Sequence, residues 1–101
     1  MPFLDPEDFL PTGLDIRALL IRRPSATFFM RAKGDALKAD GIRDGDLLVV
    51  DRSVEPGSGD IAVVSEDGQL AIRKIGAERE RQGCAEVWGT VTYSITSHGK
   101  R

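Results

Sequence analysis

The residues between Lys33 and Asp51 form the densest group of chemically useful side chains in the sequence. Three short groups of glycine and aspartate precede an apolar run: Gly34 and Asp35, Asp40 and Gly41, and Asp44, Gly45 and Asp46. Glycine permits backbone conformations in which a side chain would clash, and aspartate accepts hydrogen bonds from nearby amides in turns. As composition alone, this pattern predicts a tight loop that leads into a strand.

Outside that segment, the single histidine and the single cysteine form no catalytic or metal-binding pattern. His98 lies near the carboxyl end, and Cys84 has neither a second cysteine nor a nearby histidine to give a metal-ligand spacing. Ser25 and Ser58 have no adjacent base, which a nucleophilic hydroxyl needs. We therefore expect no metal and no cofactor.

Short apolar runs separated by glycine and aspartate are typical of an all-β domain. The strands expected from them cover residues 26–32, 47–50, 61–64, 70–75 and 86–96. The dipeptide Asp67-Gly68 predicts a tight hairpin, because the favoured hairpin turns need positive φ. Asp15 can cap a short helix over residues 16–21, which must end before Pro24. The expected fold class is mainly β with a short amino-terminal helix.

Three segments lack this pattern. Prolines in residues 1–13 block helix formation and predict an extended arm whose apolar residues need cover. Residues 76–83 contain no apolar side chain larger than alanine, which predicts a solvated connection. Residues 98–101 are expected to form a flexible tail.

Strand alternation assigns side chains to faces. In the fourth strand, Arg73 and its neighbour Lys74 are expected to point to opposite faces. In the last strand, uninterrupted alternation separates an apolar face from a face of Trp88 and threonines. The first set is Val87, Gly89, Val91, Tyr93 and Ile95. We expect one face to be core and the threonine face to be wet or part of an interface.

Length and composition restrict the class of protein. A chain of 101 residues has room for one domain. The net charge of -2 lacks the basic excess of proteins that bind nucleic acid through phosphates. No apolar stretch approaches the ~20 residues needed to span a bilayer, and the amino terminus has no secretory signal pattern. We therefore expect a cytoplasmic protein that contacts neither nucleic acid nor membrane directly.

The order of the motifs resembles the LexA and UmuD family of self-cleaving proteins. In that family a Gly-Asp-Ser-Met box is followed by Gly-Ile, then by Gly-Asp and an apolar strand. The chain has Gly34-Asp35-Ala36-Leu37, Gly41-Ile42 and Gly45-Asp46 in these places. The UmuD branch fits best through Pro24-Ser25-Ala26-Thr27, Gly59-Asp60-Ile61 and Asp67-Gly68. The resemblance covers about residues 15–75, resumes at Trp88-Gly89, and implies a single LexA/UmuD C-terminal-like domain of curled β-sheets over residues 14–97.

The resemblance also implies a lost active site. In the family a serine attacks a peptide bond, and a lysine kept neutral by burial takes its proton. Position by position, the nucleophile falls on Ala36 and the general base on Arg73. Alanine has no heteroatom, and arginine, with a pKa above about 12, stays protonated. The chain also lacks the Ala-Gly or Cys-Gly bond that the family cuts.

These substitutions imply a catalytically inactive, UmuD′-like accessory subunit in the SOS response and DNA damage tolerance. In the family, loss of an amino-terminal arm yields a form that dimerises and partners a Y-family translesion polymerase of the UmuC type, with the RecA filament as a further partner. This chain begins close to where that processed form begins, so we expect it to be made already short. The alternatives are a self-cleaving serine peptidase of the family inactivated by engineered substitution, and a module that titrates a host homologue by mixed dimerisation.

Overall fold

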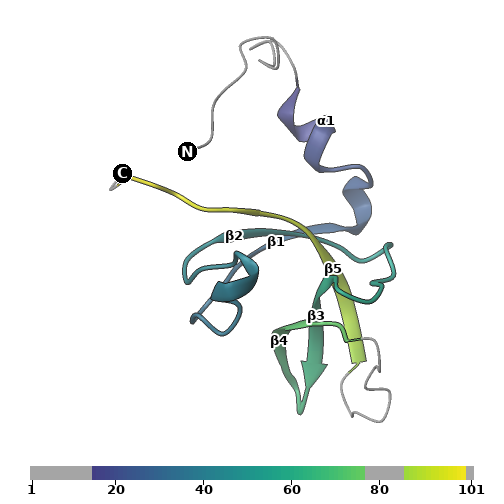
Figure 1. The fold of residues 1–101 in the computed structure, drawn as a ribbon. Helices are drawn as coiled ribbons and strands as arrows, with labels where there is room; N and C mark the ends of the chain where they lie inside the picture. Colours follow the sequence, from purple (N-terminus) through teal and green to yellow (C-terminus); the bar gives the residue numbers. More distant parts are fainter. Residues whose placement is uncertain (1–14, 77–85, 100–101) are drawn as a thin grey trace.

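The computed structural model describes residues 15–76 and 86–99. This part of the chain is mainly β, with one five-stranded antiparallel sheet and one short α-helix, which confirms the expected fold class (Figure 1). The strands are β1 (Thr27–Arg31), β2 (Leu47–Asp51), β3 (Ile61–Glu66), β4 (Gln69–Lys74) and β5 (Glu86–Ile95). None of the described helices is both long and apolar enough to cross a membrane.

Several expectations fall on other parts of the chain. The extended arm predicted for residues 1–13 and Cys84 lie outside the described residues. So do all but the first residue of the connection predicted over 76–83, and the last two residues of the predicted tail, 98–101. The beginning of that tail, His98 and Gly99, is exposed and belongs to no strand or helix.

The helix α1 (Ile16–Leu20) begins as the sequence predicts. The side chain of Asp15 accepts a hydrogen bond from the backbone N–H of Arg17 at 3.0 Å. The following 3-10 turn, η2 (Pro24–Ala26), opens with a proline. In Figure 1, α1 stands to one side of the sheet. Its apolar residues Ile16 and Leu19 are 53% and 45% exposed, so the helix adds little to the core.

The strand order in the sheet is β1-β2-β5-β3-β4, so the last strand in the sequence lies between β2 and β3. The hairpin between β3 and β4 turns at Asp67 and Gly68, which have φ values of 52° and 81°. These positive values confirm the predicted turn. The outer strands of the described sheet are β1 and β4.

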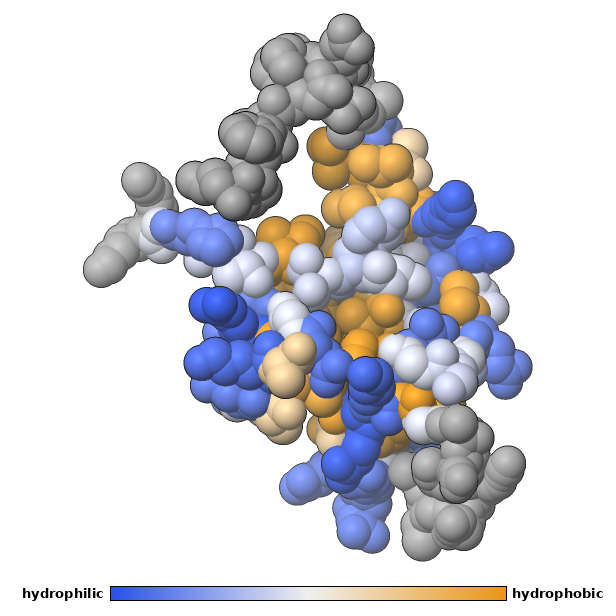
Figure 2. All heavy atoms as spheres, viewed as in Figure 1, coloured by the Kyte–Doolittle hydropathy of each residue, from blue (hydrophilic) through white to orange (hydrophobic). Residues whose placement is uncertain are grey.

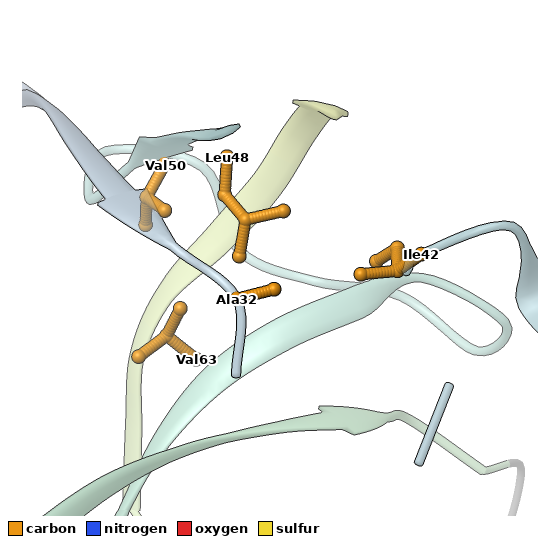
Figure 3. Close-up of a cluster of buried hydrophobic side chains, with 5 residues drawn as sticks. All are labelled: Ala32, Ile42, Leu48, Val50 and Val63. Carbon is orange, nitrogen blue, oxygen red and sulfur yellow. The ribbon is translucent and has the colours of Figure 1, made fainter. Parts of the chain in front are cut away.

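The core lies around β2, which is buried along most of its length. Figure 3 shows its central cluster, in which side chains from the end of β1, a loop, β2 and β3 meet. The members are Ala32, Ile42, Leu48, Val50 and Val63. The short apolar strand predicted over residues 47–50 is present and is covered on both faces, because Leu48, Val49 and Val50 are all at most 2% exposed.

The face assignment predicted for the last strand is wrong. Its pairing with β2 jumps from Val49–Tyr93 to Val50–Val91, and its pairing with β3 jumps from Val63–Gly89 to Val64–Val87. Each shift inserts an extra residue on β5, which breaks the alternation of faces.

The burial of β5 follows from these two bulges. Thr90 is buried at 4% exposure, and its hydroxyl donates to the backbone oxygen of Val54 at 2.7 Å. Trp88 and Val91 both pack against the core. Three residues of the predicted apolar face are exposed by 43–44% instead: Val87, Tyr93 and Ile95.

Candidate functional site

The loop between β1 and β2 carries the glycine-aspartate box and is braced by two aspartates. The backbone N–H of Gly34 donates to Asp44 Oδ1 at 2.6 Å, and the backbone N–H of Asp44 donates to Asp35 Oδ1 at 3.1 Å. Gly34 has φ 88°, a value that strains residues with a side chain. This cross-brace fixes the turn that presents Ala36, which is exposed.

The same loop is anchored to the core after the 3-10 turn η3 (Lys38–Asp40). Gly41 ends that turn with φ 92°, and Ile42 then enters the core at 4% exposure. The N–H of Ile42 donates to the backbone oxygen of Leu37 at 3.1 Å. The box turn is therefore held at both ends by contacts within the fold.

Asp46 at the end of the loop has a structural role that its sequence context did not reveal. It is 2% exposed and accepts the hydroxyl of Thr96 at 2.6 Å and the backbone N–H of Arg43 at 2.9 Å. The Thr96 hydrogen bond is the main cause of the lowered pKa of Asp46, and His98 also contributes through its charge. Asp46 thus ties the start of β2 to the end of β5.

An open hollow of about 510 Å³ lies beside the box. It is lined by residues from the end of β1, the box, β2, β3 and β4: Met30, Arg31, Ala32, Lys33, Ala36, Leu48, Val63, Leu70, Ala71, Ile72 and Arg73. The lining includes both Ala36 and Arg73, the two positions to which the resemblance assigns the nucleophile and the base. Ala36 on the loop and Arg73 on the outer strand β4 are 37 residues apart in the sequence, and both line the hollow.

The Arg73 guanidinium is held by Glu66 across the β3–β4 hairpin. Nε donates to Glu66 Oε2 at 2.8 Å, and Nη2 donates to Glu66 Oε1 at 2.6 Å. These hydrogen bonds raise the pKa of Arg73 above its already high value and lower the pKa of Glu66. Arginine at this position stays charged and cannot accept a proton.

Lys74 makes a different contact, as neighbouring residues on a strand should. Its Nζ donates to Asp40 Oδ1 in η3 at 3.0 Å. The two cations of β4 are thus paired with different carboxylates. The Lys74 pair also ties β4 to the loop that carries the box.

The other chemically interesting residues stay apart from the hollow. Ser25 lies in η2, and neither Ser58 nor His98 is among the lining residues. Across residues 15–76 and 86–99, no cluster of histidine, cysteine and carboxylate side chains could hold a metal ion.

Comparisons with known proteins place this geometry in context. The model of the family described as Peptidase S24-like matches residues 4–83. Protein SamA of Salmonella typhimurium is 44% identical over 68 residues, which cover 67% of this chain and 49% of SamA. Protein MucA of Escherichia coli is 30% identical over 103 residues, covering 84% of this chain and 70% of MucA.

A third relative is LexA repressor 1 of Xanthomonas axonopodis pv. citri. It is 41% identical over 83 residues, covering 71% of this chain and 40% of the repressor. The chain spans about half the length of SamA and less than half of this repressor.

Proposed function

The chain belongs to the Peptidase S24-like (LexA/UmuD) family, and on that premise we propose that it is a catalytically inactive, UmuD′-like accessory protein of the cytoplasmic SOS response. In this proposal residues 14–97 form the family domain, and Ala36 and Arg73 stand at the positions of the catalytic pair. The observation that carries it is that two substitutions occur together. Position 36 has only a methyl side chain, and position 73 has an arginine bound to the carboxylate of Glu66.

Peptide cleavage by this family needs a nucleophile and a neutral amine beside it. The methyl group of Ala36 cannot attack a carbonyl carbon. Arg73 cannot take a proton, and its two hydrogen bonds to Glu66 stabilise the charged form further. Lys74 is the nearest amine in the sequence, but its Nζ is bound to Asp40. Both catalytic steps are therefore blocked.

The described contacts around the two positions hold the loop and its neighbouring strands in place, which favours a protein kept for binding. The aspartate cross-brace holds the box turn, and Asp46 and Lys74 tie the loop to β5 and β4. Such contacts preserve the shape of the domain without contributing a reactive group. In the proposed role this shape serves a Y-family polymerase of the UmuC type, and the RecA filament, as protein partners.

We further propose that the protein acts as a homodimer. Val49 on β2 lies opposite Phe29 on β1 and opposite Tyr93 on β5. The side chains of Phe29 and Tyr93 are 56% and 43% exposed. Paired residues of neighbouring strands share a face, so Phe29 and Tyr93 lie on the same face of the sheet as Val49. Figure 2 shows apolar side chains along α1 and in the middle of the viewed face. A second copy would remove such side chains from water, and two-fold dimers are the commonest assembly.

The test of inactivity is incubation at alkaline pH, which neutralises a catalytic lysine. The unaltered chain should stay intact by mass spectrometry, and it should leave a supplied peptide with an Ala-Gly bond uncut. Ala36→Ser alone should remain inactive because no base is present. Ala36→Ser with Arg73→Lys is expected to recover cleavage of the peptide, and robust proteolysis by the unaltered chain would contradict the proposal.

The test of the partner is co-purification with a Y-family polymerase of the UmuC type. The unaltered protein should co-purify with the polymerase through a salt wash, and a Leu48→Ala variant with a weakened core should be retained less. Preferential capture of a full-length UmuD homologue, with no retention of the polymerase, would instead favour titration by mixed dimerisation.

A further inference from the structure

The hollow beside the box has an unbalanced charge. Its lining contains three cationic residues, Arg31, Lys33 and Arg73, and no carboxylate. The chain as a whole has a net charge of -2, so this concentration of positive charge is local. The nearby carboxylates of Asp35 and Asp44 are turned onto backbone N–H groups of the loop. Arg73 is paired with Glu66, so the positive rim of the hollow consists of Arg31 and Lys33.

The three cations keep hydrogen-bond donors available. Arg31 donates from Nη1 to the backbone oxygen of Gly45 at 2.9 Å, and Arg73 uses Nε and Nη2 on Glu66. A guanidinium has five N–H donors, so each arginine has others to offer. Lys33 is exposed at the hollow. A carboxylate that enters from solvent can reach Arg31 and Lys33 without displacing Glu66.

The floor and one side of the hollow are apolar and include an outer strand. Leu48 and Val63 belong to the buried core, and Leu70 and Ile72 come from β4. The backbone of Ile75, just beyond β4, exchanges hydrogen bonds with residues 59 and 60 on the β3 side. Because alternate residues of an antiparallel strand direct their backbone groups to the same side, those of Leu70 and Ile72 point away from β3. No described strand pairs with that edge.

We propose that this hollow binds an extended segment of a partner protein in which carboxylates alternate with apolar side chains. The segment lies along the outer edge of β4 and pairs with the backbone of Leu70 and Ile72. Its apolar side chains fill the hollow, and its carboxylates meet the Arg31 and Lys33 rim. The inference rests on the proposed function, because a site without a nucleophile holds such a segment without cutting it.

Charge complementarity selects this occupant over others. A basic segment would bring its cations against Arg31 and Lys33, whereas the charge of Arg73 is already paired with Glu66. A neutral apolar segment would leave the rim without partners. An extended conformation supplies the alternation directly, since successive side chains of a strand point to opposite sides. The edge of β4 then provides backbone hydrogen bonds independently of sequence.

The experiment uses fluorescence anisotropy with a labelled peptide, Gly-Leu-Asp-Phe-Glu-Leu-Asp-Gly, and a neutral counterpart with Asn and Gln. Two exposed charge pairs should make the acidic peptide bind about 2- to 30-fold more tightly at low salt. The advantage should shrink as ionic strength rises. Lys33→Gln should weaken acidic-peptide binding about 2- to 5-fold. Lys38→Gln, on the same loop but outside the lining, is the matched control and should leave it unchanged.

Backbone amide NMR shifts locate the peptide. Shifts should be concentrated at residues 70–73 and at Lys33. Equal affinity for the two peptides, equal effects of the two lysine variants, shifts elsewhere, or no saturation at millimolar peptide would each overturn the inference. A different result would assign the hollow to the chain's own residues 1–13 and overturn the inference. In that case the peptide would cause shifts only after residues 1–13 are deleted, and a separate peptide of residues 1–13 would displace it from the shortened chain. Whether the chain cleaves the peptide is read separately by mass spectrometry, so failure to bind and failure of inactivity are distinguishable.

Discussion

Gly89 on β5 should not tolerate even a methyl group. A Cβ atom at this position would lie 2.8 Å from Val50 Cγ1 and 3.4 Å from Arg52 Cγ. Val50 is fully buried in a central strand and cannot retreat. Overpacking of this kind costs about 1–3 kcal/mol. We therefore predict that Gly89→Ala destabilises the domain.

Gly57→Ala is the matched control, because a Cβ there would meet only Asp60 Oδ2, at an ordinary 3.8 Å. Both substitutions restrict the unfolded chain by a similar amount, so that contribution largely cancels between the two variants. Gly89→Ala should then be less stable than Gly57→Ala by about 1–3 kcal/mol.

The assay is urea unfolding followed by fluorescence of Trp88, the only tryptophan. The expected difference moves the urea midpoint by about 1 M. Equal midpoints for the two variants would refute the close approach of Gly89 to the Val50 side chain, and with it the pairing of β5 with β2.

Three further predictions concern charge and assembly. The pKa values of Asp46 and Asp51 are lowered by hydrogen bonds, from Thr96 and Ser53 respectively, so both carboxylates stabilise the fold above their usual value of 3.8. The urea midpoint of the unaltered chain should be constant from pH 7 to 5 and should fall as the pH drops below about 4. The fall should be less steep in Asp46→Asn than in the unaltered chain. A constant midpoint down to pH 2.5 would contradict this prediction. A lysine placed at position 73 should be kept protonated by the carboxylate of Glu66. Adding Glu66→Gln to the Ala36→Ser, Arg73→Lys variant should therefore move the pH at which the cleavage rate rises to a lower value. An unchanged pH profile would count against the role of Glu66. Light scattering across dilution should give a dimer for the unaltered chain and a monomer for Tyr93→Glu, with Leu70→Glu as the control, and a monomer of unaltered chain at micromolar concentration would exclude the dimer.

Many features of the candidate site could be predicted from the sequence because they depend on neighbouring residues. The positive φ values at Gly34 and Gly41, the aspartate-rich turn, and the hairpin at Asp67 and Gly68 follow from local chemistry. The position of Ala36 after Gly34-Asp35 needs only the order of the motif. Alternation along β4 was also sufficient to separate Arg73 from Lys74, since no bulge interrupts its pairing with β3.

The same rule of alternation failed on β5, and the reason is the tertiary structure. β5 pairs with β2 on one side and β3 on the other, and each pairing contains a register shift. Those shifts depend on how strands from distant parts of the chain fit together. No pattern within residues 86–96 reveals them. As a result Thr90 is buried and Tyr93 is exposed, the reverse of the simple expectation.

The partners of the charged side chains also depend on the tertiary structure. The sequence by itself determined which residue types stand at positions 36 and 73, and therefore that a nucleophile and a proton acceptor are missing there. Only the folded chain decided that Glu66 holds Arg73, that Asp40 holds Lys74, and that Asp46 meets Thr96 some 50 residues away. Local backbone preferences act over a few residues, whereas these side chains meet only after the sheet has brought its strands together.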